Sequence, residues 1–436
     1  MNKKMTIVVI DGGGRGAALV DKYSQSPQVE KIIAIPGNDL MTLNKSKSVK
    51  IFPELKTTDV DKIIDICKQQ KVNLVDVAQD NAVAVALVDK LLENKITVFG
   101  PTQKAGQLEW DKSWSRNFMK KYELPIPEFY VFNNREEGLN FLDNHPDKAW
   151  VVKASGLAEG KGVIITQNNS EAKTAIDEMS RFGQSGQTYL LEECLVGEEF
   201  SAFAVVDGLD FQMVGFAQDH KRVNDHDHGP NTGGMGCVSN PLIVDENIKS
   251  QIKDIFQKTV SGMIAENRPY QGILYLGGMV VDKKVFIIEF NCRWGDPEAQ
   301  VIIPSIKNDL VDVSFSVINH QLNRNLIKTD SQTRIVVTGA SKGYPVDYNV
   351  VKGKQIFGLE KIFNSKTIKL FGAGTQYQNN KFFAHGGRLF YLVALGENII
   401  IARKNVYDAL STISIKGDNL HYRTDIGWRD VARLSK

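Results

Sequence analysis

The chain has 436 residues; 42% of them are hydrophobic, 24% are charged, and the formal net charge at pH 7 is +2. This length exceeds what one hydrophobic core supports, so we expect about two to four domains. The small net charge excludes a broad surface for nucleic acid or for anionic membranes, and it leaves room for a local basic pocket.

The cysteines and the apolar runs indicate a cellular location. Cys67, Cys194, Cys237 and Cys292 lie far apart and form no Cys-x-x-Cys pair, which argues against a disulfide scaffold or a zinc knuckle and fits a reducing cytosol. The apolar run at 6–10 is too short for a signal peptide, and no stretch is long and apolar enough to span a membrane. We therefore expect a cytoplasmic protein without nucleic-acid or membrane partners, and we expect it to be a monomer.

Strand-like and helix-like runs alternate over the N-terminal part of the chain. We expect strands at 6–10, 30–35, 72–77 and 96–99, and helices from Ala17 onward, at 60–71 and at 82–94. This alternation predicts a parallel α/β sheet with helices on both faces, forming a first domain over 1–103.

The later runs predict two further domains. Residues 150–166 indicate a strand, a glycine loop and a strand, residues 188–206 two strands, 249–266 a helix and 272–290 strands again. We assign 104–328 to a second domain, whose Pro-rich hinge at 124–127 and glycine loop predict a mobile lid over about 125–195. Strands at 333–337 and 386–394 with a helix at 399–412 predict a separate α+β module over 329–436. The predicted fold class is therefore α/β and α+β, multidomain.

Glu289 and Asn291 lie at the end of an apolar, β-branched run. Side chains at i and i+2 of a strand point the same way, so both oxygen donors face one side. A carboxylate beside an amide oxygen suits Mg²⁺, which takes a few protein oxygens and shares the rest with nucleotide phosphates. Arg293 adds a planar cation for a phosphate or a carboxylate. A salt-bridged strand end is the alternative interpretation.

Two further runs suit a nucleotide. The run at 153–162 follows an apolar strand, its glycines let backbone N–H groups approach phosphate oxygens, and Lys153 and Lys161 add positive charge. The run at 190–199 places carboxylates at a strand end, where they could accept hydrogen bonds from a ribose diol. A solvated hairpin turn and an acidic surface turn are the respective alternatives.

The polar segment at 218–240 has no clear period and is long for a loop in a compact protein, which indicates a functional or mobile segment. His220 is its best-placed titratable side chain near neutral pH, and Lys221 and Arg222 could hold phosphates. His226 and His228 do not predict zinc, because no further His or Cys follows at metal-site spacing.

The run Gly12-Gly13-Gly14-Arg15-Gly16 joins the first strand to a helix, which aims backbone N–H groups and the helix dipole at an anion. These glycines lack the Gly-x-Gly-x-x-Gly spacing, and Pro36-Gly37-Asn38 stands where a dinucleotide-binding fold has its acidic residue. The pattern favours a monophosphate ligand over NAD.

Taken together, these runs resemble the ATP-grasp enzymes, and among them the phosphoribosylamine–glycine ligases (glycinamide ribonucleotide synthetases), in the same order over nearly the whole chain. The similar motifs are Pro36-Gly37-Asn38, Phe99-Gly100-Pro101, Gln107-Leu108-Glu109, the glycine loop at 153–162, the acidic run at 192–199, the run at 218–222, the glycines at 229–236, the run at 289–297, and the C-terminal motifs at 340–345, 385–388 and 422–427. The resemblance implies a pre-ATP-grasp, Rossmann-like N-terminal domain, an ATP-grasp domain and a C-terminal domain.

The resemblance also implies a reaction, namely ATP-dependent ligation of glycine to 5-phosphoribosylamine in de novo purine biosynthesis. Glycyl phosphate is the implied intermediate, and glycinamide ribonucleotide, ADP and phosphate are the implied products. ATP with Mg²⁺ or Mn²⁺ would be required, and Glu289 and Asn291 would bind the metal.

By the same resemblance, the catalytic residues are Arg293, Asp219 and Lys221. The residues expected to bind ATP are Lys112, Lys153, Gly160, Lys161, Glu192, Glu193, Cys194, Leu195 and Glu199. The residues expected to bind the other substrates are Gly13, Gly14, Arg15, Pro36, Gly37, Asn38, Asn231, Thr232 and Gly233.

The chain departs from the family pattern at four places. Gly16 and Ala17 replace the Glu-His pair of the first loop, and a Gly-Pro-Glu stretch reads Ala78-Gln79-Asp80. A Lys-Ala-Asp-Gly motif has Ser155 in place of Asp, and a Ser-Lys pair has Asp111 in place of Ser. Because two departures lie in the N-terminal domain, an ATP-grasp ligase for another amine or carboxylate is an alternative. A nucleotide-binding regulatory or scaffold protein is a further one, against which the retained metal ligands argue.

Overall fold

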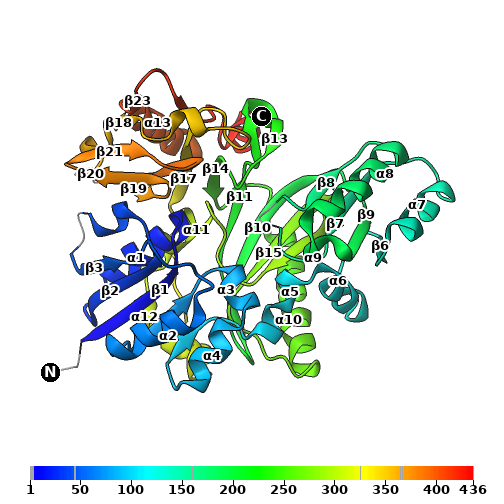
Figure 1. The fold of residues 1–436 in the computed structure, drawn as a ribbon, viewed down its shortest axis with the longest axis horizontal. Helices are drawn as coiled ribbons and strands as arrows, with labels where there is room; N and C mark the ends of the chain where they lie inside the picture. The colour runs from blue at the N-terminus through cyan, green and yellow to red at the C-terminus, as the bar shows by residue number, and fades with distance from the viewer. Residues whose placement is uncertain are drawn as a thin grey trace.

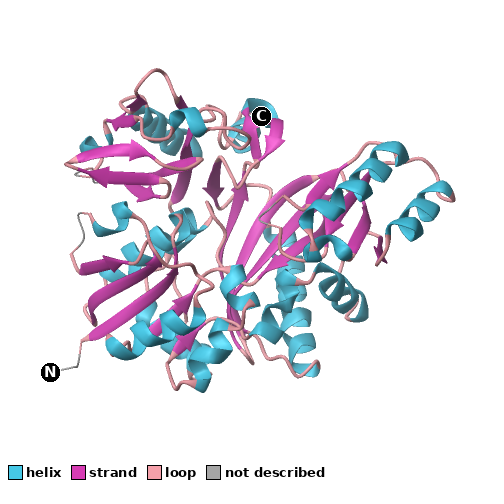
Figure 2. Cartoon of the chain, in the orientation of Figure 1, coloured by secondary structure: helices cyan, strands magenta, loops and turns pink. Residues whose placement is uncertain are grey.

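The computed structural model describes residues 4–43, 46–158, 161–324, 326–363, 365 and 367–435. Figure 1 shows the N-terminal strands (blue) and the C-terminal strands (orange) on one side of the molecule, and the segment over 129–193 projecting on the other side. Helices cover the sheets of all these parts, as Figure 2 shows, so the predicted mixture of α/β and α+β architecture is confirmed.

The N-terminal part forms the predicted parallel sheet, in the order β3-β2-β1-β4-β5. Its strands are β1 (Met5–Asp11), β2 (Val29–Pro36), β3 (Ser48–Ile51), β4 (Leu74–Val77) and β5 (Val98–Phe99). Alternate residues of β1 enter two different cores: Val8 and Ile10 pack on one face, Ile7 and Val9 on the other. This burial on both faces explains why β1 is continuously apolar.

The helices of this part lie close to the predicted positions, with one interruption. They are α1 (Gly14–Ser24), α2 (Val60–Gln69), α3 (Asp80–Ala84) and α4 (Leu87–Glu93). The helix predicted at 82–94 is broken because Ala86 adopts a left-handed backbone conformation with φ of 60°. Strand β3, which the sequence analysis missed, extends the sheet beside β2.

The projecting segment has its own antiparallel sheet in the order β6-β9-β7-β8. Its strands are β6 (Phe129–Phe132), β7 (Trp150–Ala154), β8 (Val163–Ile165) and β9 (Tyr189–Glu193), and its main helices are α7 (Arg135–Asp143) and α8 (Asn169–Glu178). Trp150 lies fully buried at the centre of a core that draws only on residues of this segment. A core of its own allows the segment to move as one body.

A long antiparallel sheet connects the middle of the chain to its C-terminal part, in the order β16-β15-β10-β11-β14-β17-β22-β19. Its strands are β10 (Glu198–Asp207), β11 (Phe211–Asp219), β14 (Gly236–Ser239), β15 (Gln271–Val281), β16 (Lys284–Asn291), β17 (Thr333–Ser341), β19 (Ile368–Gly372) and β22 (Arg388–Gly396), and α10 (Glu246–Ala265) packs on it. The pairing of β14 with β17 joins the C-terminal block to the central domain through main-chain hydrogen bonds.

The C-terminal block also carries a smaller sheet in the order β20-β21-β18-β23 and the helix α13 (Ile399–Leu410). The smaller strands are β18 (Gln355–Phe357), β20 (Thr375–Gln378), β21 (Lys381–Ala384) and β23 (Ser414–Ile415). The block fixes the long polar segment predicted at 218–240. Arg423, fully buried, donates to Asp425 through two bonds of 2.7 Å and to Asp227 at 2.8 Å.

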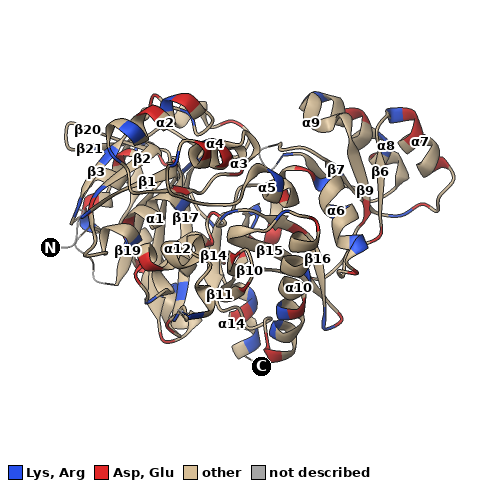
Figure 3. Cartoon of the chain, turned by 90° about the horizontal axis from the view of Figure 1, so that it is seen from below, with Lys and Arg blue, Asp and Glu red and all other residues tan. Residues whose placement is uncertain are grey.

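Basic and acidic residues are interspersed along the chain, as the blue and red segments of α2, α7 and α10 in Figure 3 show. Within the described ranges, no helix combines the length and the apolar composition that crossing a membrane requires.

Candidate active site

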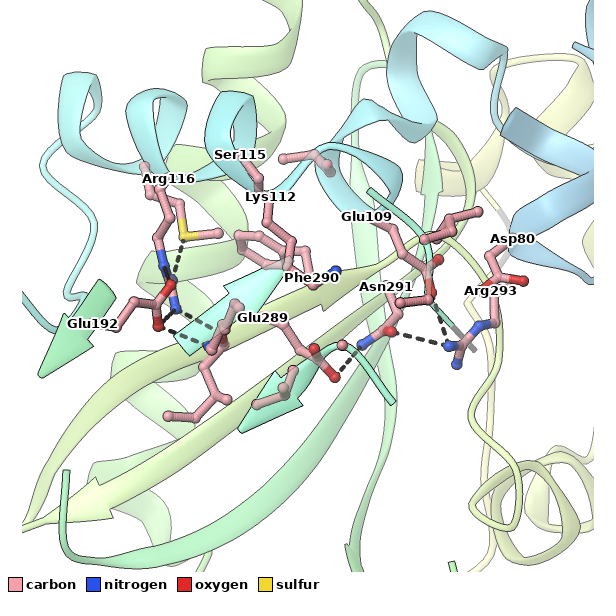
Figure 4. A pocket seen from close by; sticks show the side chains of 18 residues that line it. Asp80, Glu109, Lys112, Ser115, Arg116, Glu192, Glu289, Phe290, Asn291 and Arg293 are labelled. Atoms are coloured by element: carbon pink, nitrogen blue, oxygen red, sulfur yellow. Dashed lines mark hydrogen bonds and ion pairs between the residues drawn. The ribbon is translucent and has the colours of Figure 1, made fainter. Parts of the chain in front are cut away.

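The principal pocket lies where the projecting segment, which the sequence predicted as a lid, meets the long antiparallel sheet. The helices α5 (Gln103–Trp110) and α6 (Lys112–Lys121) form one wall, β7 and β9 another, and the end of β16 forms the floor (Figure 4). Its lining residues are Asp80, Leu108, Glu109, Lys112, Ser115, Arg116, Met119, Lys153, Leu157, Ala158, Gly162, Val163, Glu192, Ile288, Glu289, Phe290, Asn291 and Arg293.

The structure brings the predicted metal ligands together on this floor. The Nδ2 atom of Asn291 donates to Oε1 of Glu289 at 3.5 Å, and Oδ1 of Asn291 accepts from Arg293 at 3.1 Å. Figure 4 shows these three side chains in a row along the end of β16, with Lys112 above them. The alternation of the strand therefore places the three groups as the sequence spacing predicted.

The Glu289 carboxylate lies in a positive environment. Burial by itself raises the pKa of this carboxyl, but Lys221, Lys153, Lys112 and Arg293 together lower it below its ordinary value. Glu289 is therefore ionised at neutral pH. The carboxylate of Glu289 and the amide oxygen of Asn291, which faces Arg293 in this structure, form a donor set that suits Mg²⁺ or Mn²⁺ once the amide turns toward the ion.

Arg293 is held by a carboxylate that the sequence analysis did not select as a site residue. Its Nη2 atom lies 2.8 Å from Oε1 of Glu109, a buried residue of α5. The other oxygen of Glu109 accepts from the backbone N–H of Cys292 at 2.7 Å. Glu109 therefore fixes the backbone of Cys292 and the side chain of Arg293, which directly follow the predicted metal ligands. The Gln107-Leu108-Glu109 motif carried this signal in the sequence.

A buried cluster of charges joins α6 to the lid. Arg116 donates to both oxygens of Glu192, at 2.7 and 2.8 Å, and the ammonium of Lys153 lies 2.7 Å from the same carboxylate. Burial raises the pKa of Glu192, but Arg116 and Lys153 outweigh it and bring the pKa to about 2. Both Glu192 oxygens are thus engaged by cations. No motif in the sequence identified Arg116.

The rest of the predicted nucleotide residues lie around the rim. Glu193 is exposed at the end of β9, and Cys194 and Leu195, which follow directly, are half-buried. Glu199 lies 2.5 Å from Lys221 as an ion pair at the surface. Lys161 is exposed, and Gly160 lies outside the described residues.

Lys112 is the first residue of α6 and reaches toward the glycine loop, where its ammonium donates to the carbonyl oxygen of Gly156 at 3.2 Å. Burial lowers its pKa, and the nearby Lys153 ammonium adds to this effect. Two departures from the family pattern meet beside it, because the Ser155 hydroxyl donates to Oδ1 of Asp111 at 3.0 Å. The family pattern has Ser at position 111 and Asp at position 155, whereas this chain has Asp111 and Ser155. A carboxylate and a hydroxyl therefore face each other in both arrangements.

Asp219 and Lys221 lie at the end of β11, on the side that faces the C-terminal block. Burial raises the pKa of Asp219 well above its ordinary value, and the buried Glu298 carboxylate adds to this. Partial burial of Lys221, whose side chain is still 41% exposed, lowers its pKa, but Glu199, Glu289 and Asp219 outweigh this and raise the pKa above its ordinary range. Lys221 therefore remains protonated, and its charge acts on both Glu289 and Asp219.

The C-terminal block contributes Arg388 to this region, a residue of the motif at 385–388 for which the sequence predicted no role. Its Nη1 atom donates to the carbonyl oxygen of Asp296 at 2.8 Å and to that of Gly233 at 2.5 Å. Thr232 accepts from Gly234 at 3.0 Å and donates to the carbonyl oxygen of Lys221 at 2.7 Å, whereas Asn231 is exposed at the end of β13 (His228–Asn231). The glycine segment therefore stays close to Lys221.

His220 does not titrate near neutral pH, so the expectation for this residue is corrected. It is buried, its Nδ1 atom lies 3.2 Å from the carbonyl oxygen of Gly236, and its Nε2 atom accepts from the backbone N–H of Gly427 at 3.1 Å. Burial, followed by the nearby Arg423 guanidinium, lowers its pKa to about 4. His220 is a neutral structural residue that anchors the C-terminal segment.

A second pocket, of about 500 Å³, opens at the carboxyl edge of the N-terminal sheet. This volume is in the range of small-molecule sites. The pocket contains four of the residues predicted around the ribose phosphate or beside them: Gly12, Gly13, Pro36 and Gly37. Its remaining lining residues are Pro53, Leu55, Lys56, Thr57, Thr58, Gln79 and Asn81.

Arg15, Gly14 and Asn38 were predicted to bind substrate, but they do not line this second pocket. Arg15 is buried and donates to Asp11 at 2.7 Å and to the carbonyl oxygen of Trp294 at 2.8 Å. A Cβ at Gly14 would meet Tyr391 at 2.2 Å, so this glycine packs on the C-terminal block. Asn38 donates to the carbonyl oxygens of Gly12 and Gly372. These residues connect domains.

The buried Asp11 carboxylate occupies the inside of the glycine loop. It accepts from the backbone N–H of Gly13 at 2.5 Å and from that of Gly16 at 3.2 Å. A Cβ at position 16 would lie 2.8 Å from Asp11, so glycine is required there. This close contact explains the departure at Gly16, and it satisfies loop N–H groups that the sequence suggested for an external anion.

Comparisons with known proteins match every part of this architecture. Models of the phosphoribosylglycinamide synthetase family match residues 5–109 (N domain), 110–299 (ATP-grasp (A) domain) and 334–429 (C domain). The phosphoribosylamine–glycine ligase of Vibrio parahaemolyticus is 37% identical over 435 residues, which cover 98% of this chain and 99% of the relative.

Two further relatives extend the comparison. The trifunctional purine biosynthetic protein adenosine-3 of Gallus gallus is 37% identical over 99% of this chain, but the chain spans only 43% of the length of that relative. Among solved structures, the phosphoribosylamine–glycine ligase of Thermotoga maritima has a TM-score of 0.81 at 27% identity, covering 97% of this chain and 100% of that one.

The Arg116–Glu192–Lys153 cluster gives a prediction about stability and pH. Because the folded pKa of Glu192 is about 2 against an ordinary value of 4.5, its ionised form stabilises the fold above about pH 4.5, and this contribution is lost as the pH falls toward 2. We expect Glu192→Gln to lower the free energy of unfolding by about 3 kcal/mol at pH 7. Urea denaturation at pH 7, 5, 4 and 3 should show the difference from wild type shrinking as the pH falls.

Glu193→Gln, at the exposed next position, is the matched control and should change the unfolding free energy by less than about 0.5 kcal/mol at every pH. A Glu192→Gln deficit that stays constant from pH 7 to pH 3 would contradict the assignment of this carboxylate as the ionised partner.

Proposed function

The chain belongs to the phosphoribosylglycinamide synthetase family, and we propose that it ligates glycine to 5-phosphoribosylamine, with ATP converted to ADP and phosphate. The observation that carries this proposal is the row of Glu289, Asn291 and Arg293 in a pocket that also receives Lys112 and Lys153. The family's reaction needs metal-binding oxygens and cations around the nucleotide phosphates. These groups lie between the end of β16 and the predicted lid. The chain is thus an ATP-dependent ligase with small-molecule substrates.

The charges of the pocket suit phosphoryl transfer to a carboxylate. ATP and glycine both carry negative charge, so the ammonium groups of Lys112, Lys153 and Lys221 would lower the repulsion as the glycine carboxylate attacks the γ-phosphorus. Arg293 would orient that carboxylate. The ammonium of glycine would pair with Asp219, whose raised pKa such a cation would bring back down.

Glycyl phosphate would then react with the amine of phosphoribosylamine, and phosphate would leave. The amine is already a nucleophile, so its position and the exclusion of water matter more than a strong base. Glu289 and Asn291 would hold Mg²⁺ or Mn²⁺. A divalent ion bound there would supply charge neutralisation of the nucleotide phosphates.

The first experiment measures ADP release with ATP, Mg²⁺, glycine and freshly made phosphoribosylamine, omitting each substrate in turn. We expect turnover to need both glycine and the amine, with glycinamide ribonucleotide as product. Glu289→Gln should lower kcat at least about 100-fold, because a developing charge loses its counter-ion site. Turnover of this variant at the normal rate would show that Glu289 does not hold the metal.

The second pocket offers a place for the phosphate of the amine substrate. Lys56 is the only cation among its described lining residues, and its ammonium forms no ion pair within the described part of the chain. Because Asp11 already takes the N–H groups of Gly13 and Gly16, the positive charge for a phosphate must come from elsewhere on the rim. We therefore assign the phosphate end of the amine to Lys56, with Thr57, Thr58 and Asn81 near it.

Lys56→Gln should raise the KM for phosphoribosylamine about tenfold, the usual effect of losing one charge-assisted contact, while the KM values for ATP and glycine stay the same. Lys62→Gln removes an exposed lysine of α2 that does not line the pocket and serves as control. Equal effects of the two substitutions would remove Lys56 from the site.

The departures at Gln79 and Gly16 lie in or beside this second pocket. They favour a second candidate function, ligation of a different amine or carboxylate with the same ATP chemistry. ATP binding without turnover on glycine and phosphoribosylamine would select this alternative. We also propose that the chain acts in the cytoplasm as a monomer, with domains over 1–103, 104–328 and 329–436.

We further propose that about 125–195 moves as a lid during turnover. The principal pocket measures about 120 Å³, below the roughly 300–1,000 Å³ of small-molecule sites, so a nucleotide requires it to widen. The separate core around Trp150 allows such a movement. Limited proteolysis should cleave this segment more slowly when ATP and Mg²⁺ are present; equal cleavage with and without ATP would contradict the lid.

A further inference from the structure

Asp111 and Ser155 form a contact between the body of the protein and the lid, beside the principal pocket. The Ser155 hydroxyl donates to Oδ1 of Asp111 at 3.0 Å and accepts from the backbone N–H of Ser113 at 3.0 Å. The carbonyl oxygen of Ser155 accepts from the backbone N–H of Lys112 at 2.9 Å. Ser155 is buried, so these bonds are shielded from water.

The Asp111 carboxylate is an ionised acceptor that organises both elements. It caps α6 by accepting from the backbone N–H of Trp114 at 3.1 Å, and its second oxygen accepts from the side chain of Gln107 at 2.9 Å. Partial burial raises its pKa, but the donated hydrogen bonds outweigh this and lower it. Hydrogen bonds to an ionised acceptor are roughly twice as strong as neutral ones.

This contact restrains Lys112 and Lys153, which belong to α6 and to the proposed lid respectively. Lys112 follows Asp111 directly in α6, whereas Lys153 lies two residues before Ser155 in the lid strand β7. The two ammonium groups repel each other, since Lys153 contributes to the lowered pKa of Lys112. The Arg116–Glu192 ion pair holds Lys153 against α6 on one side, and the Asp111–Ser155 contact holds the glycine loop against α6 on the other. Loss of the second contact would let this repulsion widen the spacing of the two ammonium groups and reduce the positive potential in the pocket.

We propose that Asp111 and Ser155 are positioning residues for ATP, which hold Lys112 and Lys153 at the spacing that the nucleotide phosphates require. The proposal rests on the use of ATP in the proposed function. The pair acts through the lysines and does not itself touch the nucleotide. Lid movement would then occur about this contact, which keeps the glycine loop attached to α6.

The test measures the dissociation constant for ATP with Mg²⁺ by calorimetry, in the absence of glycine and amine. Ser155→Ala and Asp111→Asn should each weaken ATP binding about tenfold, the effect of losing one hydrogen bond to a charged group. The exchanged double variant, Asp111→Ser with Ser155→Asp, keeps a carboxylate–hydroxyl pair and should bind ATP within about threefold of wild type. The KM for glycine should stay unchanged in all of them.

Asp245→Ala is the matched control for a purely structural effect. Asp245 caps α10 by accepting from the backbone N–H of Ile248 at 2.8 Å, far from the pocket lining. This variant should lose thermal stability because alanine cannot cap the helix, and it should keep wild-type ATP binding. Because Ser155 is not the N-cap residue of α6, Ser155→Ala carries the test even where an Asp111 variant fails to fold.

Wild-type ATP affinity in Ser155→Ala, or an exchanged variant no better than the single ones, would overturn the proposal. So would an Asp245→Ala variant that weakens ATP binding equally. A wild-type chain that binds ATP but forms no glycinamide ribonucleotide would refute the proposed reaction and leave this test intact, whereas one that does not bind ATP would refute both.

Discussion

The balance of buried charges between α6, β9 and β16 is the constraint on which the rest of the site depends. Removing ions from water is costly, so each buried carboxylate here is matched by cations: Glu192 by Arg116 and Lys153, and Glu109 by Arg293. Glu289 differs, because it is surrounded by cations at longer range with no ion pair of its own in the described part of the chain. This arrangement leaves one ionised carboxylate accessible for a metal ion.

The same charges connect the domains. Arg116 binds a lid residue and also donates to the carbonyl oxygens of Ile287 and Ile288, so it holds the lid strand against the floor of the pocket. The central sheet continues through β14 and β17 into the C-terminal block, which brings Arg388 to the glycine segment beside Lys221. The principal pocket and the second pocket are thereby built on one connected frame, and the reaction that we propose needs both.

The N-terminal departures have a physical explanation. The Asp11 carboxylate accepts the hydrogen bonds of the Gly13 and Gly16 N–H groups that a bound anion would otherwise accept. Position 16 is a glycine because Asp11 leaves no room for a side chain there. The two residues therefore form one packed unit. The departures at Asp111 and Ser155 are likewise a matched pair. A carboxylate faces a hydroxyl both in this chain and in the family pattern, where the two residue types are exchanged.

The sequence by itself determined what depends on local periodicity. The alternation of strands and helices predicted the parallel sheet, and the i, i+2 spacing predicted that Glu289 and Asn291 share a face with Arg293 beside them. Only the tertiary structure decided which charges pair, since Arg116 lies 76 residues from Glu192 and no local pattern encodes that distance. It likewise decided that His220 is neutral and structural, because burial against a distant C-terminal segment, rather than any neighbouring residue, lowers its pKa.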